Sequence, residues 1–216
     1  MRTLYHFQFS PFSRRTRLAL AYKGLEHELR EGRANPAFGE EGKKLWPLRT
    51  LPVLVEDDGR VIGDSGAIVE YIDAAYIAGA RLWPTEPEAN RVAVEVAALV
   101  DGALNLLIDV GTRYYALRDH PEWKTVRDEM VGRAQAALGV LSARVAERGP
   151  RPLTSQGWCA PDIWLFTAAV WLDGLPGRAS QSPNAAQIVS LAWSLPAPLL
   201  RWSEAFRARE DVLALG

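Results

Sequence analysis

The side chains that most often perform chemistry in proteins are few in this chain. Its three histidines stand far apart in the sequence, at His6, His27 and His120. This separation argues against a histidine metal site. Cys159 is the single cysteine, which excludes an intrachain disulfide, a paired-cysteine redox centre and a cysteine metal site. The remaining candidates are a hydroxyl at Ser10 and an acid beside a hydroxyl at Asp64 and Ser65, each at the expected start of a helix.

Strands and helices alternate over the first part of the chain. The pattern over residues 3–9 predicts a strand, because apolar and polar residues alternate there among good strand formers. A helix is expected next, with Ser10 as its N-cap, Pro11 in its first turn and Gly24 at its C-terminal end. A short strand around residues 27–30 would then complete a βαβ unit.

Further elements of the same kind are expected before residue 80. Residues 35–46 are interpreted as an irregular helix. Residues 51–63 read as two strands around an Asp-Gly turn, which predicts an antiparallel hairpin. Asp64 and Ser65 then supply N-cap chemistry for a helix whose apolar positions recur four residues apart from Ile68.

Beyond a segment with two prolines at 81–87, only helical periodicity remains. The pattern predicts one very long helix over 92–117 and a second helix over about 122–148. A third, central helix should start within Cys159–Asp162, and shorter helices are expected over 185–194 and 197–207. The expected architecture is therefore an α/β domain at 1–80, a linker at 81–87 and an all-α helical bundle domain at 88–216.

Composition excludes several broad classes of function. The 216 residues are 48% hydrophobic and 24% charged, as in globular proteins, and their net charge of −1 offers nothing to attract nucleic acid. The longest apolar run, over 163–172, is too short to span a membrane. The first residues lack the apolar stretch of a signal peptide, so a cytoplasmic protein with no membrane segment is expected.

The order of these elements and the residues at their junctions resemble the cytosolic glutathione transferase superfamily. That family joins a thioredoxin-like domain to an all-helical one, and the likeness extends over nearly the whole chain. It rests on four stretches: SPFSRRTRLALAYKGL from Ser10, TLPVL from Thr50, GDSGAIVEYI from Gly63, and Asp162 at the start of the central helix.

The resemblance implies a binding site for glutathione. It implies that Pro52 is a cis proline, that Leu51 offers its backbone to the cysteine of glutathione, and that Asp64 and Ser65 hold the γ-glutamyl end. These roles make physical sense, because an ammonium needs an acid, and a helix N-terminus with a hydroxyl suits a carboxylate. The alternative is that Asp64 and Ser65 only cap their helix. Arg49 could meet the glycyl carboxylate or remain a solvated side chain.

Ser10 lies where the zeta and omega types of this family carry their catalytic serine or cysteine. A hydroxyl and a helix N-terminus that lower a thiol pKa from ~8.5 by about two units would stabilise the thiolate by roughly 2.7 kcal/mol. Ser13 is the second candidate for this role. Ser10 also has a purely structural role available as an N-cap, and the two roles are compatible. Tyr5 lies inside the expected strand and is assigned to the core.

An electrophile pocket would lie between the two domains. Phe12, Tyr114 and Tyr115 are its candidate lining residues, although aromatic side chains at helical spacing more often pack in a core. Three arginines of the first helix are interpreted as solvated or paired across a domain interface rather than catalytic: Arg14, Arg15 and Arg17.

Three functions follow from these residues. The leading one is a glutathione transferase, with glutathione as co-substrate, a small apolar electrophile, no permanently bound cofactor and no metal. The alternatives are a zeta-like glutathione-dependent isomerase and a non-catalytic binding or scaffold protein. The resemblance also implies a homodimer. Serine rather than cysteine at position 10 argues against thiol exchange, and the sequence WPL from Trp46 departs from the Asn-Pro pair of many relatives.

Overall fold

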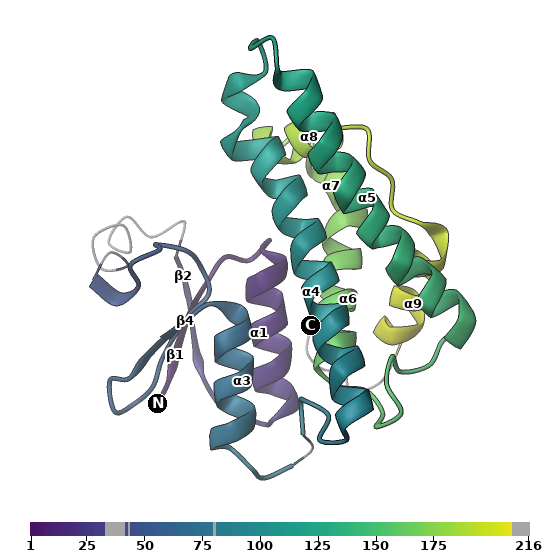
Figure 1. Ribbon diagram of the computed structural model, residues 1–216. Coiled ribbons are helices and arrows are strands. Elements are labelled where there is room, and N and C mark those ends of the chain that lie inside the picture. The colour runs from purple at the N-terminus through teal and green to yellow at the C-terminus, as the bar shows by residue number, and fades with distance from the viewer. Residues whose placement is uncertain (33–41, 43, 80, 209–216) are drawn as a thin grey trace. The chain divides into compact units, whose positions relative to one another are not determined.

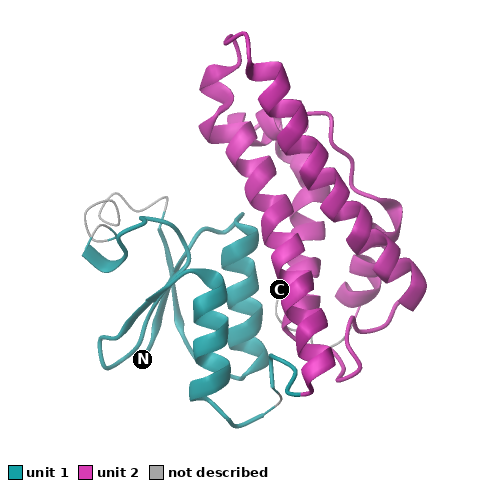
Figure 2. Cartoon of the chain, in the orientation of Figure 1, with its two compact units in different colours: residues 1–85, 209–216 teal, residues 86–208 magenta. Residues whose placement is uncertain are grey.

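The computed structural model describes residues 1–32, 42, 44–79 and 81–208. These residues form two compact units, one over 1–85 and one over 86–208 (Figure 2). The first unit holds a small sheet with helices and the second is helical, which confirms the predicted fold class. The irregular helix expected over 35–46 lies largely outside the described residues.

The sheet of the first unit has four strands in the order β2-β1-β3-β4. Their bounds are Thr3–His6 for β1, Glu28–Glu31 for β2, Val53–Val55 for β3 and Val61–Gly63 for β4. Strand β1 pairs with β2 in parallel and with β3 in antiparallel orientation, and β3 pairs with β4 as an antiparallel hairpin. The predicted βαβ unit and hairpin are thus both confirmed. Tyr5 and Val53 are almost fully buried and pair directly across the sheet.

Strand β1 ends at His6, three residues before the predicted end at Phe9. The reason lies in two side chains that take backbone donors away from the ladder. The hydroxyl of Ser13 accepts a hydrogen bond from the N–H of Phe7 at 3.1 Å, and Glu31 Oε2 accepts from the N–H of Gln8 at 2.9 Å. The chain therefore turns after His6 although its residues favour a strand.

Two helices pack side by side against the sheet, α1 (Pro11–Tyr22) and α3 (Ser65–Ala75), as Figure 1 shows. Both begin at the predicted N-caps. Ser10 Oγ accepts from the N–H of Ser13 at 3.2 Å. One carboxylate oxygen of Asp64 accepts from the two backbone N–H groups at the start of α3. Gly24 follows the end of α1 with a φ of 64°, a conformation that glycine adopts without strain.

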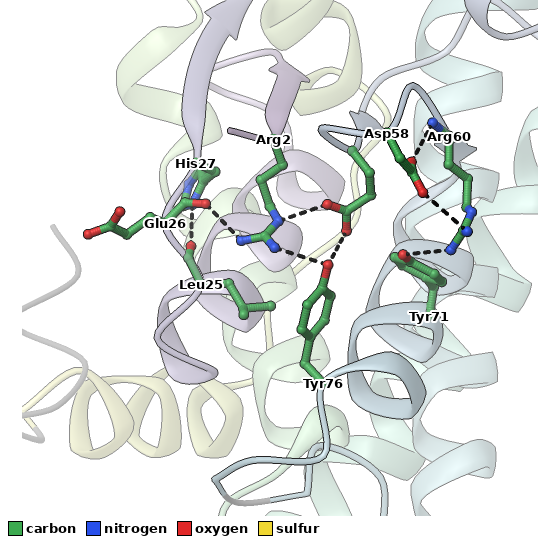
Figure 3. A network of polar contacts seen from close by, with 9 residues as sticks. Arg2, Leu25, Glu26, His27, Asp58, Arg60, Tyr71 and Tyr76 are labelled. Atoms are coloured by element: carbon green, nitrogen blue, oxygen red, sulfur yellow. Dashed lines mark hydrogen bonds and ion pairs between the residues drawn. The ribbon is translucent and has the colours of Figure 1, made fainter.

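A polar network joins the other end of the sheet to the end of α3 (Figure 3). Arg2 donates to Glu56 Oε2 at 3.1 Å, to the hydroxyl of Tyr76 at 3.0 Å and to the carbonyl of Glu26 at 2.9 Å. The hydroxyl of Tyr76 donates to Glu56 Oε1 at 2.8 Å. Burial, together with this bond to Glu56, raises the pKa of the Tyr76 phenol. Because Glu56 is buried, the network fixes this end of the sheet firmly.

The second unit is built from helices and helical turns. Their bounds are Pro87–Ile108 for α4, Asp109–Arg113 for the π-helical turn η1, Tyr115–Leu117 for the 3-10 turn η2, Trp123–Arg148 for α5, Ala160–Asp173 for α6, Leu175–Arg178 for α7, Pro183–Val189 for α8 and Ala197–Arg207 for α9. Helix α6 is buried on nearly all sides, as its apolar composition predicts. No helix among the described residues is long and apolar enough to cross a membrane.

The very long helix predicted over 92–117 is confirmed up to Ile108 and wrong beyond it, because regular α-helix ends there. Gly111 packs so closely against Ile188 of α8 that a Cβ at this position would overlap the isoleucine side chain. The hydroxyl of Thr112 also donates to the carbonyl of Ile108 at 2.6 Å. A contact between segments far apart in sequence therefore accompanies the wider π-helical turn.

The later helices also differ from the prediction. Helix α8 ends at Val189 rather than near Ser194, and the short α7 was not predicted. The side chain of Gln135 on α5 accepts from the N–H of Ser194 at 2.9 Å and donates to the carbonyl of Ser194 at 3.0 Å. Ala192 has a φ of 60°, which no right-handed helix contains, so the helix cannot extend to Ser194. The chain beyond α8 is held against α5 instead.

Candidate functional site

The topology brings the predicted site residues to one end of the sheet. Strand β3 is antiparallel to both β1 and β4, so β1 and β4 end where β3 begins. The register makes this concrete, since Tyr5 pairs with Val53 and Val53 pairs with Gly63. The predicted site residues that flank these strand ends are Ser10, Leu51, Pro52, Asp64 and Ser65.

Ser10 is half-buried at the N-terminus of α1. Its oxygen accepts the N–H of Ser13, and a hydroxyl that accepts one bond still has a proton to donate. The N-cap role and donation to an anion therefore coexist. Ser13 itself is fully buried, and its hydroxyl accepts the N–H of Phe7. Of the two serines, Ser10 is the one that is partly exposed.

The peptide bond between Leu51 and Pro52 is cis, as the resemblance implies. Leu51 is half-buried, and its N–H and carbonyl form no hydrogen bond with another described residue. This segment thus presents extended backbone to which a peptide could pair. Arg49, two residues earlier, is exposed and has a φ of 54°.

Trp46 occupies the place where the sequence departs from the family pattern. Its indole ring packs so closely over Gly63 that a Cβ there would overlap it, and its Nε1 donates to Thr50 Oγ1 at 3.2 Å. The same ring belongs to the apolar cluster around Tyr5 and Val53. Trp46 therefore connects the segment before Pro52 to the strand that leads into Asp64.

Asp64 adopts an unusual backbone conformation, with φ 74° and ψ 136°. Only glycine populates this region readily, so an aspartate there stores of order 1–3 kcal/mol of strain. Oδ1 accepts from the N–H groups of Gly66 at 2.8 Å and Ala67 at 3.2 Å. Oδ2 bonds no described residue, and the side chain is exposed. Asp64 thus has one oxygen engaged in capping and a second one available.

Ser65 and Arg15 form a buried pair that the sequence interpretation missed. Arg15 is 1% exposed and Ser65 is 2% exposed, and the Nη1 of Arg15 donates to Ser65 Oγ at 3.1 Å. The guanidinium also lies over the ring of Phe12, 5.3 Å from its centroid. The interpretation of Arg15 as a solvated charge is therefore wrong. The signal was present, because Arg15 lies three residues before the core residue Leu18 on the same helical face.

The three residues predicted to line an electrophile pocket are described within their own units. Phe12 is half-buried on α1 in the first unit. In the second unit, Tyr114 is 44% exposed, while Tyr115 packs edge-on against Trp123 with 6.1 Å between ring centroids. The pocket itself stays a prediction. Among the described residues, no group of three or more histidine, cysteine or acidic side chains could hold a metal ion.

Comparison with known families identifies the first unit. The family model described as "Glutathione S-transferase, N-terminal domain" matches residues 4–79, which include β1 from Leu4 onward, the other three strands of the sheet and the candidate site residues of the first unit. The first unit is thus an N-terminal domain of the glutathione S-transferase kind. The relatives below extend into the helical unit.

Two curated relatives and one solved structure illustrate what the whole chain is similar to. The probable glutathione S-transferase GSTU1 of Oryza sativa subsp. japonica is 30% identical over 152 residues, which cover 63% of this chain and 61% of that protein. The maleylacetoacetate isomerase of Rattus norvegicus is 32% identical over 110 residues, 48% of this chain and 49% of that protein. The chain therefore spans less than two thirds of each of these relatives.

The solved structure covers the whole chain. A glutathione transferase family member from Pseudomonas fluorescens Pf-5, with bound glutathione, is 25% identical with a TM-score of 0.69, over 100% of this chain and 98% of that one. The fold of this chain is thus shared with that structure over the full length of both chains.

Proposed function

We propose that this protein is a glutathione transferase whose thiol activation depends on Ser10. One observation carries the proposal: a hydroxyl at a helix N-terminus, an unpaired backbone segment before a cis proline and an acid beside a serine–arginine pair flank the same end of the sheet. These are the groups that an extended peptide with an ammonium, a thiol and two carboxylates requires. The structures with bound glutathione among similar proteins support the same ligand.

The γ-glutamyl end of glutathione would bind at the start of α3. The available oxygen of Asp64 would accept from the ammonium. Ser65 accepts from Arg15, so its own proton is free to be donated to the γ-glutamyl carboxylate, with the helix N-terminus adding further donors. The buried positive charge of Arg15 favours an anion at this place. Leu51 would pair with the cysteinyl backbone, and Arg49 would meet the glycyl carboxylate.

The reaction would begin with loss of the thiol proton to solvent. The hydroxyl of Ser10 would donate to the resulting thiolate, and the N-terminus of α1 would add its dipole. The thiolate then forms a carbon–sulfur bond with a small apolar electrophile, and the displaced group leaves with the electron pair. Phe12, Tyr114 and Tyr115 would line the electrophile pocket. Ser13 would not take part in the reaction, and its hydroxyl would continue to accept the N–H of Phe7.

Several wider features belong to the same proposal. We propose a glutathione-binding domain over 1–80 and a helical domain over 88–216, with a linker between them. A cytoplasmic homodimer acting in detoxification is consistent with the family. The likeness to the rat isomerase favours one alternative, in which the activated thiol adds to a double bond and later leaves. A scaffold protein without catalysis is the remaining alternative, and it predicts weak or no glutathione binding.

Replacing Ser10 by alanine tests the proposal directly. We expect the thiol of bound glutathione to have a pKa of about 6.5 in the wild-type protein and about 8.5 in Ser10→Ala, measured by the ultraviolet absorbance of the thiolate across pH. Conjugation activity should fall about 50-fold at pH 6.5 and hardly at all at pH 9.5, because the thiol ionises by itself at high pH.

Ser10→Thr is the matched control, since it keeps both the hydroxyl and the N-cap. It should retain a lowered thiol pKa. Calorimetric titration with glutathione completes the test. An equal thiol pKa in the wild-type and alanine proteins would contradict activation by Ser10, and absence of glutathione binding by the wild type would favour the scaffold alternative.

Replacing Asp64 by asparagine separates capping from ligand binding. Asparagine keeps an oxygen that can accept from Gly66 and Ala67, so stability should change by no more than about 1 kcal/mol. Glutathione affinity should fall about 10- to 100-fold, because the bond to the ammonium loses its negative partner. Glutaryl-cysteinyl-glycine, which is glutathione without its amino group, should bind both proteins equally. If glutathione binds both proteins equally as well, Asp64 only caps the helix.

A further inference from the structure

The turn that carries Ser10 is held by side chains from two directions. This β1–α1 turn comprises residues 7–10. From α1, Ser13 accepts the N–H of Phe7 at 3.1 Å, and from β2, Glu31 accepts the N–H of Gln8 at 2.9 Å. The N–H of Ser10 closes the turn by donating to the carbonyl of Phe7 at 3.0 Å. These bonds help to set the position of the Ser10 hydroxyl.

Arg17 contacts both the last residue of β1 and the backbone of the β1–α1 turn. It lies one helical turn after Ser13, so both side chains face the end of β1. Its Nη1 lies 2.9 Å from Nδ1 of His6, and its Nη2 donates to the carbonyl of Gln8 at 3.4 Å. A guanidinium is a planar fork, and here the fork holds a strand side chain and the turn backbone at once.

This arrangement requires a neutral His6. His6 is 5% exposed, and a guanidinium can only donate, so Nδ1 must be the unprotonated acceptor. The titratable and charged groups that act on the ring are Arg17 from α1, Glu31 from β2 and His27 from the segment before β2, and Arg14 acts on Arg17. Burial and the charge of Arg17 lower the pKa of His6 below its usual value, although Glu31 opposes this.

We propose that Arg17, held by the neutral imidazole of His6, is a positioning residue that fixes the β1–α1 turn and so aims the hydroxyl of Ser10 at the thiolate. The inference rests on the proposed function, because it concerns how Ser10 is presented to glutathione. When His6 binds a proton, Nδ1 can no longer accept and the imidazolium repels Arg17. The turn then loosens, and thiol activation weakens for a reason separate from protonation of the thiol itself.

The first test replaces Arg17 by methionine, which keeps the apolar stem, and compares it with Arg60→Met. Arg60 is an exposed arginine of the same unit and bonds Asp58 and Tyr71 at the far end of the sheet. The thiol pKa of bound glutathione should rise by about one unit in Arg17→Met and stay unchanged in Arg60→Met. S-methylglutathione, which has no thiol proton, should bind both variants as it binds the wild type. A general loss of structure would weaken this ligand too.

The second test follows the turn without any ligand. Amide hydrogen exchange at residues 7–10, corrected for its intrinsic pH dependence, should speed up about 10-fold as the pH falls from 7 through the range in which His6 binds a proton, a range read from the NMR titration of its imidazole. His6→Asn places a non-titrating acceptor near the position of Nδ1, so its exchange should not change with pH in this way. Arg17→Met should exchange fast over the whole pH range.

The outcomes separate this inference from the proposed function. If Ser10→Ala raises the thiol pKa while Arg17→Met and Arg17→Lys leave it unchanged, the role of Arg17 is overturned and the transferase proposal stands. Lysine keeps the charge without the fork, so it serves where the methionine variant does not fold. If the wild-type protein binds no glutathione, both proposals fail. A pH-independent exchange rate in the wild-type turn would overturn the part played by His6.

Discussion

Replacing Asp162 by alanine is expected to lower the free energy of unfolding of the helical unit by about 3–5 kcal/mol. Asp162 is fully buried at the start of α6. Its Oδ1 accepts from the N–H of Leu153 at 2.9 Å and its Oδ2 from the N–H of Cys159 at 2.9 Å. Alanine removes both acceptors and leaves two buried backbone donors, each of which costs about 1–3 kcal/mol.

The neighbouring cysteine explains why Asp162 matters so much. Cys159 stands at the N-cap of α6, where serine or threonine would accept a backbone bond more strongly. Burial and the adjacent carboxylate raise the pKa of its thiol to about 12, so it stays a neutral, weak partner. The structural role predicted for Asp162 is thus confirmed.

Urea unfolding followed by tryptophan fluorescence and circular dichroism measures this effect, because Trp164 and Trp202 are buried in the same unit. Asp119→Ala is the matched control: this aspartate is exposed, and its contact with Arg118 is 3.9 Å long. The control should change stability by less than about 0.5 kcal/mol. An equally small change in Asp162→Ala would mean that water or a rearranged loop satisfies both donors.

The second large effect is expected at Asp73, where alanine should lower the free energy of unfolding of the first unit by about 3–5 kcal/mol. Asp73 is 1% exposed on α3. Its Oδ1 accepts from Lys23 Nζ at 3.1 Å and from the N–H of Leu82 at 2.8 Å. Its Oδ2 accepts from the N–H of Trp83 at 3.1 Å and lies 3.2 Å from Nε of Arg81.

The size of this effect comes from the buried ion pair. The ammonium of Lys23 is fully buried, so removing the carboxylate keeps a positive charge in a region of low polarity. The double variant Asp73→Ala with Lys23→Met should be more stable than Asp73→Ala alone, because both charges are then absent. Glu70→Ala, an exposed acid on the same helix, is the control. Additive effects of the two substitutions would contradict a direct coupling between them.

Local sequence rules predicted most elements of the first unit. Ser10 and Asp64 are N-caps, residues 57–60 form the turn of the hairpin, and Gly24 ends α1, all as expected. Each of these features depends on interactions within about four residues along the chain. For this reason a single sequence was sufficient to predict their positions. For the same reason, short stretches of sequence were sufficient to reveal the family resemblance.

The candidate site was only partly accessible in this way. The sequence indicated Ser10, Asp64 and Ser65 from residue type and position, but their spatial proximity follows from the antiparallel pairing of β3 with β1 and β4. Arg15 was missed because an arginine on a helix is usually solvated. Its burial depends on Ser65, fifty residues away in the sequence.

The sequence by itself thus determined the order of elements, their caps and turns, and the family to which they point. The tertiary structure decided where regular structure stops and which charges are buried. Helix α4 gives way to a π-helical turn where Gly111 meets Ile188, and β1 stops at His6 because Ser13 and Glu31 take its next backbone donors. Local propensity acts over a few residues, whereas burial and charge pairing depend on segments that meet only after folding.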